Sequence, residues 1–194
     1  MKVLVACEFS GVVRDAFRRR GHDAWSCDFE PPEGEFPQFH LVGDVRPWLT
    51  PAWDLLIAHP PCTYLCNSGV RWLYGGKGAE RDRVRWGLME QGAAFFRAML
   101  DAPVPRIAVE NPIAHRHAGL GEPTQIIQPW QFGHGEIKAT CLWLKNLPKL
   151  KSNGVVEGRY ARVHRASPGP DRWKERSRTY TGIAEAMAEQ WGAA

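Results

Sequence analysis

The feature that most constrains the fold is a short apolar run that ends in two prolines and a cysteine. Residues 55–58, Leu-Leu-Ile-Ala, are typical of a strand that is buried on both faces of a parallel sheet. Pro60 and Pro61 end this strand, because proline lacks an amide donor and holds the preceding residue in extended geometry. Cys62 is therefore expected just beyond the carboxyl end of a core strand, where open α/β sheets bind their ligands.

Two roles are open to Cys62. A thiol held on a proline-stiffened loop at this edge is a candidate nucleophile. On position alone a buried thiol is the commoner case, since free cysteine is among the most buried residue types. His59, Cys62 and Cys66 are residue types found in zinc sites, but no matching pair of ligands is evident elsewhere, so we expect no metal. His115 and His117 are expected to lie on the surface.

Length and composition fit one domain with its own core. The 194 residues are 44% hydrophobic and 24% charged, and the net charge is +4. Five cysteines without a regular framework favour a reducing cytoplasm. We find no apolar run of membrane-spanning length, and the apolar run at the start of the sequence meets a charge at Glu8, too early for a signal peptide. We therefore expect a single cytoplasmic domain over residues 1–194, with no membrane partner.

The order of the predicted elements is that of an α/β domain. Hydrophobic runs of strand length alternate with segments that have apolar residues at helical spacing. Strands are expected over residues 2–7, 23–27, 40–45, 53–58 and 105–109, and helices over residues 12–20, 80–100 and 182–191. The first helix is expected to turn its arginines to solvent and to end at Gly21. The longest helix is expected to face the sheet with Val84, Leu88, Phe95 and Met99.

Acidic residues follow several of these strands. The first strand is followed by Glu8-Phe9-Ser10-Gly11, the second ends at Asp28, and the third runs into Asp44. A glycine-containing turn, followed about 20 residues later by an acid at the end of the next strand, matches the logic of an adenosine site. Taken singly, Glu8 and Asp28 are equally well explained as helix-terminal or loop acids.

Two segments are expected to lie outside the sheet. Residues 63–79 are rich in glycine and predict a mobile loop over the site. Residues 149–178 form a basic segment with Tyr160, His164 and Trp173 among its cations, a mixture found at nucleic-acid sites. Its candidate nucleic-acid-binding residues are Arg159, Arg162, Arg165, Arg172, Lys174, Arg176 and Arg178. A solvated basic surface is the alternative.

In this order, the motifs resemble those of the DNA (cytosine-5) methyltransferases over nearly the whole chain. Residues 8–11 match the opening motif of that family, Asp28 its ribose-binding acid, and residues 43–45 the segment that holds the adenine of S-adenosylmethionine. Residues 61–69 are similar to the Pro-Cys catalytic loop, and residues 109–111 to the Glu-Asn-Val motif. Further matches are Phe132-Gly133 with Lys138 and Thr140, and the closing segment 178–188. The pairing of Pro-Cys with Glu-Asn is the most specific part of the resemblance.

The sequence also departs from that family. The glycine-rich first turn is reduced to Gly11-Val-Val-Arg14, Thr63 replaces glutamine, and Pro112 replaces valine. Lys138 and Thr140 stand where the family has an arginine pair. The large target-recognition region has no counterpart, because about 35 residues separate Cys141 from Arg178 and independent domains begin near 50. The chain is most similar to compact, phage-type members, which implies a bacterial or phage-encoded protein.

The resemblance implies a Rossmann-like methyltransferase fold, a mostly parallel sheet with helices on both faces. It implies transfer of a methyl or larger one-carbon group from S-adenosylmethionine to carbon 5 of cytosine in DNA. Cys62 would add to carbon 6, Glu110 would stabilise charge at ring nitrogen 3, Asn111 would fix the loop, and Lys138 would orient the base. The cofactor would contact Glu8, Phe9, Ser10, Gly11, Asp28, Asp44 and Pro60. The target base would be flipped out of the duplex or already unpaired, with little sequence preference.

Three other functions stay open. Residues 58–64, Ala-His-Pro-Pro-Cys-Thr-Tyr, also resemble the Asn/Asp-Pro-Pro-Tyr loop of amino-methyltransferases, although Glu110-Asn111 argues against that class. A free pyrimidine nucleotide could replace DNA as the substrate. A catalytically inactive protein of the same fold could bind nucleic acid through its basic segment.

Overall fold

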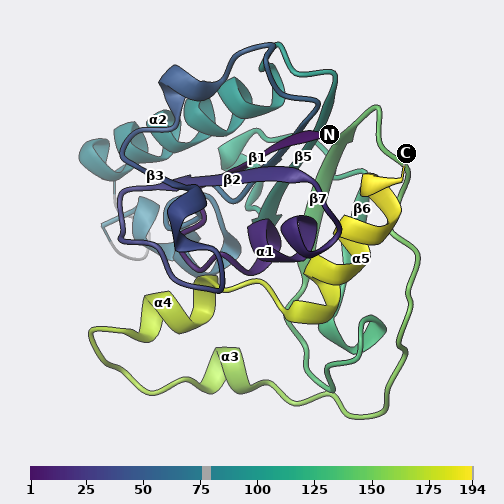
Figure 1. The fold of residues 1–194 in the computed structure, drawn as a ribbon. Coiled ribbons are helices and arrows are strands. Elements are labelled where there is room, and N and C mark those ends of the chain that lie inside the picture. Colours follow the sequence, from purple (N-terminus) through teal and green to yellow (C-terminus); the bar gives the residue numbers. More distant parts are fainter. Residues whose placement is uncertain (76–79, 194) are drawn as a thin grey trace.

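The computed structural model describes residues 1–75 and 80–193, in which the chain forms one seven-stranded sheet of order β3-β2-β1-β4-β5-β7-β6 (Figure 1). The strands are β1 (Lys2–Ala6), β2 (Asp23–Asp28), β3 (His40–Val42), β4 (Leu55–Ala58), β5 (Arg106–Pro112), β6 (Gln125–Ile127) and β7 (Thr140–Lys145). Strands β1 to β5 pair in parallel, and β7 is antiparallel to both β5 and β6. This is the Rossmann-like methyltransferase arrangement, so the predicted fold class is confirmed.

Helices cover both faces of the sheet, as predicted. The α-helices are α1 (Val12–Arg19), α2 (Arg83–Leu100), α3 (Arg162–Arg165), α4 (Arg172–Ser177) and α5 (Thr181–Gly192). Helices α1 and α5 cover one face and α2 covers the other (Figure 1). Because side chains alternate along a strand, Val3 and Val5 belong to the core under α1 and α5, whereas Leu4 and Ala6 belong to the core under α2.

The predicted element boundaries are close, and the largest differences are three residues. Strand β5 runs to Pro112, beyond its predicted end at residue 109. Strand β3 ends at Val42, earlier than expected, and α2 begins at Arg83 because the Asp82 carboxylate caps it by accepting a hydrogen bond from the Arg85 amide (3.0 Å). Gly21 has a φ of 79° just after α1, as expected of a helix C-terminus. Helix α5 buries Ile183, Met187 and Trp191, so its predicted inner face is confirmed.

The predicted inner face of α2 is partly wrong. Val84 is 74% exposed, and Leu88 and Phe95 are only partly buried. The buried side chains are Met89, Ala93, Phe96 and Met99. The buried face of α2 is therefore rotated by about one residue around the helix axis from the predicted face, and Met99 belongs to both faces.

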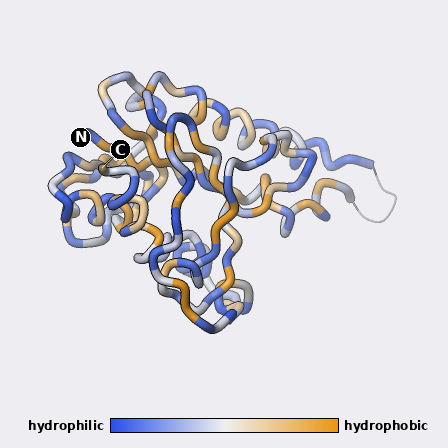
Figure 2. Tube along the Cα trace, turned by 90° about the vertical axis from the view of Figure 1, so that its right-hand side faces the viewer, coloured by the Kyte–Doolittle hydropathy of each residue, from blue (hydrophilic) through white to orange (hydrophobic). Residues whose placement is uncertain are grey.

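The segment predicted as a mobile loop contains ordered turns. Residues 67–73 form the 3₁₀ helix η3 (Asn67–Leu73), and Leu65 and Leu73 are buried in the core. Figure 2 shows the chain that borders residues 76–79 projecting from the body on the side of the view away from both termini. Residues 76–79 lie outside the described residues, and the mobility of the loop stays a prediction.

The remaining 3₁₀ helices lie in connections. They are η1 (Pro37–Phe39), η2 (Arg46–Trp48), η4 (Arg116–Ala118) and η5 (Pro129–Gln131). Helices α3 and α4 lie outside the two helix layers, on a long excursion of the chain between β7 and α5 (Figure 1). In the described part of the chain, we find no helix with the length and apolar composition needed to cross a membrane.

Candidate active site

Cys62 lies on the loop that leaves the carboxyl end of β4. The His59 amide donates to Ala6 O (2.9 Å), which extends the pairing of β4 with β1, and Pro60 is buried. The amides of Leu65 and Cys66 both donate to the carbonyl oxygen of Cys62 (3.0 and 3.1 Å). The resulting turn brings Cys66 over Cys62, and both thiols are half-buried.

The two thiols are electrostatically coupled. A hydrogen bond to Cys66, together with burial, raises the pKa of the Cys62 thiol. The same hydrogen bond, with a further one from Ser68, lowers the pKa of Cys66 to about 5 although burial opposes this. The contact therefore favours the proton on Cys62 and the negative charge on Cys66. In the sequence, Cys66 is a candidate only as a metal ligand, and its spacing from Cys62 does not reveal this hydrogen bond.

The segment that follows β5 fixes the Cys62 turn. The Asn67 amide donates to Ile113 O (3.0 Å), the His115 amide donates to Leu65 O (3.0 Å), and the His115 Nε2–H donates to Tyr64 O (2.9 Å). His115 is only 4% exposed, so its predicted surface position is wrong. Its ring is buried because it bridges two loops, whereas His117 stays partly exposed.

Glu110 and Asn111 lie at the carboxyl end of β5. Asn111 is fully buried, and its side-chain amide donates to the carbonyl oxygen of Pro112, its own neighbour. The contacts that anchor the Cys62 turn thus come from Ile113 and His115, and the predicted role of Asn111 in fixing the loop stays a prediction.

Glu110 forms a pair with a residue that the sequence analysis did not place in the reaction. His59 Nδ1 lies 3.3 Å from Glu110 Oε2, and the His59 ring is largely buried. Burial raises the pKa of the Glu110 carboxyl, but the hydrogen bond and charge of His59 and the charge of Lys138 outweigh burial and leave that pKa below its ordinary value. His59 Nε2 is buried and has no hydrogen-bond partner among the described residues.

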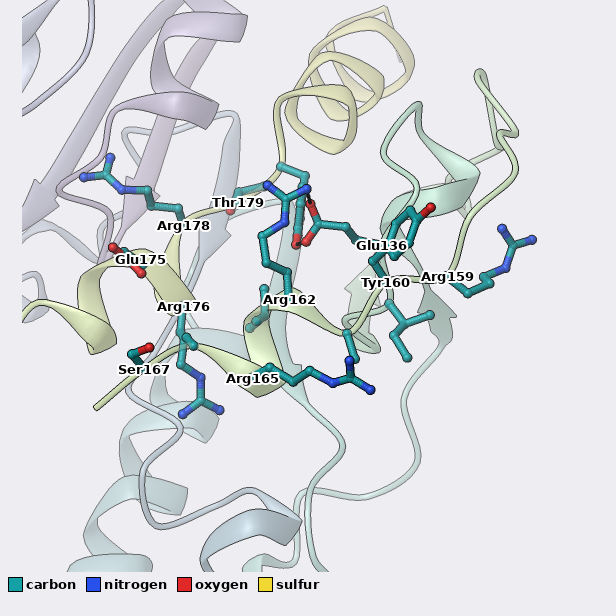
Figure 3. Close-up of a pocket in the computed structure, with 15 residues that line it drawn as sticks. Glu136, Arg159, Tyr160, Arg162, Arg165, Ser167, Glu175, Arg176, Arg178 and Thr179 are labelled. Carbon is teal, nitrogen blue, oxygen red and sulfur yellow. Dashed lines mark hydrogen bonds and ion pairs between the residues drawn. The ribbon is translucent and has the colours of Figure 1, made fainter. Parts of the chain in front are cut away.

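Lys138 connects Glu110 with a large cavity. Its Nζ donates to Arg178 O (3.0 Å) and lies 5.9 Å from the centre of the Tyr180 ring. Tyr180 and Arg178 line a cavity of about 1090 Å³ between residues 159–167 and 175–180 (Figure 3). The arginines that line it are Arg159, Arg162, Arg165, Arg176 and Arg178. We call it the arginine cavity.

Part of this positive charge is neutralised within the chain. Arg162 pairs with Glu136 (2.9 Å), and Figure 3 shows Arg162 turned toward that carboxylate, with Arg165 and Arg176 turned the other way. Glu136 also accepts a hydrogen bond from the Tyr180 hydroxyl (2.7 Å). The other predicted nucleic-acid-binding residues, Arg172 and Lys174, do not line the cavity.

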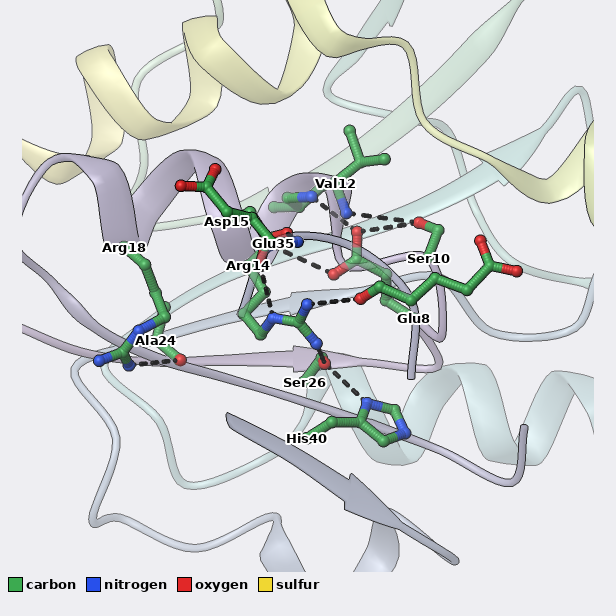
Figure 4. A network of polar contacts seen from close by, with 12 residues as sticks. Glu8, Ser10, Val12, Arg14, Asp15, Arg18, Ala24, Ser26, Glu35 and His40 are labelled. Carbon is green, nitrogen blue, oxygen red and sulfur yellow. Dashed lines mark hydrogen bonds and ion pairs between the residues drawn. The ribbon is translucent and has the colours of Figure 1, made fainter. Parts of the chain in front are cut away.

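The turn predicted to hold the cofactor is filled by the chain itself. The Glu8 carboxylate accepts hydrogen bonds from the Val13 and Arg14 amides (2.7 and 3.2 Å) and so caps α1 (Figure 4). Glu8 therefore has the helix-terminal role in this structure, and its contact with a cofactor stays a prediction. Ser10 Oγ donates to the same carboxylate (3.4 Å). Burial raises the pKa of Glu8.

Gly11 is required by the same local packing. Its φ is 71°, and a Cβ added there would lie 2.2 Å from Arg14 Nη2 and 2.6 Å from Glu33 O. Arg14 is completely buried, and its guanidinium donates to Asp15, Ser26 Oγ and Glu33 O at 2.7, 2.9 and 2.7 Å (Figure 4). The prediction that all arginines of α1 face solvent is therefore wrong for Arg14, because its donors are satisfied inside the protein.

Asp28 and Asp44 both lie at the carboxyl edge of the sheet. Burial raises the pKa of the Cys7 thiol, and the charges of Asp28, Cys27 and Asp44 add to this, so both carboxylates lie on the Cys7 side of that edge. Asp28 accepts a hydrogen bond from the Glu30 amide (3.0 Å), and Asp44 pairs with Arg46 (2.8 Å). Two carboxylates at adjacent strand ends fit the hydroxyl and amino groups of an adenosine.

The basic segment covers the predicted cofactor turn. Trp173 packs against Phe9 with ring centroids 5.8 Å apart, and Phe9 is buried. Lys174 pairs with Glu30 (2.8 Å) and Arg178 pairs with Glu33 (2.5 Å). Two of the predicted nucleic-acid-binding cations are therefore engaged with the loop beside Phe9.

A close backbone approach joins the last two motifs of the resemblance. A Cβ at Gly182 would lie 1.8 Å from the carbonyl oxygen of Phe132, so only glycine fits there. The Gly182 amide also lies 3.1 Å from His134 Nε2. In the described residues, we find no group of three or more His, Cys, Asp or Glu side chains arranged to hold a metal ion.

Comparison with known proteins identifies no family for this chain. No family model matches it, and no curated protein matches it. One solved structure with a similar fold is that of a proposed DNA modification methyltransferase encoded within a prophage of E. coli. The match has a TM-score of 0.46 and 16% sequence identity, and covers 81% of this chain and 52% of that one. The chain thus spans about half the length of that protein, and a similarity this distant carries no argument about function.

Proposed function

We propose that this protein transfers a one-carbon group from S-adenosylmethionine to carbon 5 of a cytosine in DNA, through a covalent bond to Cys62. The observation that carries the proposal is the contact between His59 and Glu110, on the loop and strand end that surround Cys62. Addition of a thiol to carbon 6 of a pyrimidine needs a proton donor for the ring and a nucleophilic sulfur nearby. These residues supply both.

Apart from the carbon 5 proton, each proton in the proposed reaction has a donor and an acceptor among these side chains. As Cys62 Sγ bonds to carbon 6, its proton passes to the Cys66 thiolate. The ring gains an electron pair, and nitrogen 3 takes a proton that the His59 imidazolium supplies by way of the Glu110 carboxylate. Carbon 5 becomes nucleophilic, and S-adenosylmethionine, when bound, supplies an electrophilic methyl group. Loss of the carbon 5 proton to a base then expels Cys62 as a thiolate, which takes its proton back from Cys66. Nitrogen 3 returns its proton through Glu110 to His59.

The residues at the carboxyl edge of the sheet do not suit the two halves of S-adenosylmethionine equally well. Asp28 and Asp44 suit the adenosine half. The Glu8–Gly11 turn does not have a free anion-binding helix end, because the Glu8 carboxylate already caps α1. We therefore assign the adenosine to Asp28 and Asp44, with Phe9 and Pro60 as apolar neighbours. Glu8, Ser10 and Gly11 would shape the turn without holding the cofactor directly.

We assign the DNA backbone to the arginine cavity. Within the described residues, Arg159, Arg165 and Arg176 take part in no ion pair, so their charge is available to phosphates. Lys138, which would orient the base, donates a hydrogen bond to the carbonyl oxygen of Arg178, and Arg178 lines the cavity. This contact supports a position for the cavity beside the reacting base. A base held there has to be unpaired, because a thiol cannot reach carbon 6 inside a duplex.

Mass spectrometry of nucleosides tests the reaction. The protein is incubated with DNA and with S-adenosylmethionine that carries a deuterated methyl group, and the DNA is digested. We expect labelled 5-methylcytosine, and none with Cys62→Ser. Labelled N4-methylcytosine or N6-methyladenine would favour amino-methyl transfer. Label in free deoxycytidine monophosphate but not in DNA would favour a nucleotide substrate, and no label in either would favour a non-catalytic binding protein.

A further inference from the structure

A second basic surface lies at the outer end of the loop that carries Cys62. Arg71 and Trp72 belong to η3, Arg81 and Arg83 lead into α2, and Arg116 begins η4. All five side chains are exposed, and Trp72 keeps 54% of its surface open to solvent. We call this group the arginine–tryptophan surface.

Contacts between three elements hold the surface together. Tyr74 forms an isolated β-bridge with Arg81, which joins the end of η3 to the approach to α2. The Arg81 guanidinium lies 4.3 Å from the centre of the Trp86 ring. The His117 ring packs against Trp86 and Tyr74 at centroid distances of 5.3 and 6.2 Å, and so brings Arg116 beside them.

The charges of this surface are not neutralised by acidic side chains. In the part of the chain that the structure describes, Arg71, Arg81, Arg83 and Arg116 take part in no ion pair. The nearby Asp82 carboxylate is occupied as the cap of α2. In contrast, the basic segment near α4 uses two of its cations to pair with the loop beside Phe9.

An exposed aromatic ring among free cations suits one kind of ligand. The Arg71 guanidinium lies 4.5 Å from the centre of the Trp72 ring, so a cation and a stacking platform are adjacent. Unpaired nucleotides offer a base to stack on such a ring and a phosphate for each cation, whereas a duplex keeps its bases stacked inside. We propose that the arginine–tryptophan surface binds unpaired nucleotides of the DNA strand that carries the target base.

The surface is continuous with the Cys62 turn. A Cβ at Gly69, within η3, would lie 2.9 Å from Thr63 O, so η3 folds directly against the residue after Cys62. The Arg85 guanidinium lies 5.2 Å from the centre of the Tyr64 ring. A base at Cys62 would thus have its strand neighbours next to η3. This inference rests on the proposed function, because it takes DNA as the substrate.

Binding without cofactor tests the surface apart from the reaction. The probe is a fluorescein-labelled single-stranded oligonucleotide of mixed sequence, and the same sequence as a duplex, titrated with the full chain at several salt concentrations. Trp72→Ala is expected to weaken single-strand binding by about 5- to 150-fold, which is the usual effect of removing one stacking platform. Arg71→Gln and Arg83→Gln are each expected to reduce the slope of log K against log salt by about 0.7.

Matched variants keep the test specific. Trp48→Ala removes a similarly exposed ring, 43% open, on η2, and Arg97→Gln removes an exposed charge from the last turn of α2. Both are expected to bind like the wild type. Trp72→Phe keeps an aromatic ring and should retain most of the affinity, and circular dichroism checks that each variant is folded.

Three results would overturn the inference: unchanged single-strand affinity in Trp72→Ala and Arg83→Gln, equal losses in the control variants, or an equal loss of duplex affinity. The last would assign the surface to the outside of a duplex. Failure of the wild type to modify DNA would refute the proposed reaction alone, since these measurements involve no chemistry. Normal modification with unchanged binding would refute the surface alone.

Discussion

His59 Nδ1 lies 3.3 Å from Glu110 Oε2, so the loop after β4 and the end of β5 share one polar contact beside Cys62. The two side chains are 51 residues apart in the sequence and come together only because β4 and β5 are neighbours in the sheet. If they deliver a proton to the ring as one unit, their variants should not act independently.

The first prediction is therefore a double-mutant cycle. His59→Gln and Glu110→Gln should each lower kcat by about 10²- to 10⁴-fold, the usual contribution of a positioned acid. The double variant should be no slower than the slower single variant, because either change removes the same proton transfer. Steady-state kinetics on a single-stranded substrate measure this, with His117→Gln as the control. Multiplicative losses would show that the two residues act separately.

The second prediction concerns the coupled thiols. Cys62→Ser should reduce transfer to background while cofactor binding survives, because an alcohol ionises far less readily than a thiol. Cys66→Ser should retain activity with a changed pH profile. In the proposed reaction Cys66, with its pKa lowered to about 5, accepts the Cys62 proton across neutral pH. Without it, Cys62 has to ionise by itself, so the rate should rise steadily with pH above neutral. An unchanged profile of kcat/KM against pH would contradict this role of Cys66.

The third prediction separates the two parts of the cofactor edge. Asp28→Ala and Asp44→Ala should weaken S-adenosylmethionine binding by about 10- to 100-fold, as expected when a hydrogen bond to a charged group is lost. Nucleic-acid affinity should not change. Glu8→Ala should instead lower the free energy of unfolding by about 1–3 kcal/mol, because it leaves the Val13 and Arg14 amides without acceptors. Isothermal calorimetry and urea denaturation give the two quantities. Unchanged cofactor affinity in both aspartate variants would refute the adenosine assignment.

The fourth prediction concerns Gly182. Gly182→Ala should destabilise the protein by about 1–3 kcal/mol, because the added methyl group meets the Phe132 carbonyl and the backbones have to separate. Gly87→Ala is the matched control in α2, where an added Cβ meets nothing within 4 Å. It should stabilise by about 0.5–1 kcal/mol through the higher helix propensity of alanine. Urea denaturation measures both. A Gly182→Ala variant as stable as the wild type would show that α5 can shift without cost.

Features that depend on local pattern were predictable from the sequence. The apolar run at residues 55–58 is fully buried as β4, and the prolines after it do place Cys62 at the carboxyl edge. The spacing of Ile183, Met187 and Trp191 gave the correct buried face of α5. Both follow from periodicity and from the backbone limits of proline, which need no knowledge of distant residues.

Features that depend on distant partners were not predictable in this way. By its position in the helical pattern, Arg14 is expected to face solvent. It is buried because Ser26 and Glu33, which are distant in the sequence, accept its hydrogen bonds. His115 looks like a polar loop residue, yet it is buried because it bonds to Tyr64 O, 51 residues away. The sequence also does not indicate that Lys174 pairs with Glu30, because the charge of a segment does not determine which residue it contacts in the fold. The reaction roles of the candidate residues stay predictions.

The contact between α1 and α5 has a consequence for how the chain folds. Arg19 and Glu185 form an ion pair (2.8 Å) across a sequence separation of 166 residues, and Phe17 shares its buried cluster with Met187. During synthesis at about 5–20 residues per second, the apolar face of α1 has to wait on the order of ten seconds for α5 to emerge. Closing so long a loop is slow, and the exposed face of α1 can meanwhile bind other chains. We therefore expect nascent chains that stall before residue 181 to be clients of chaperones and prone to aggregate.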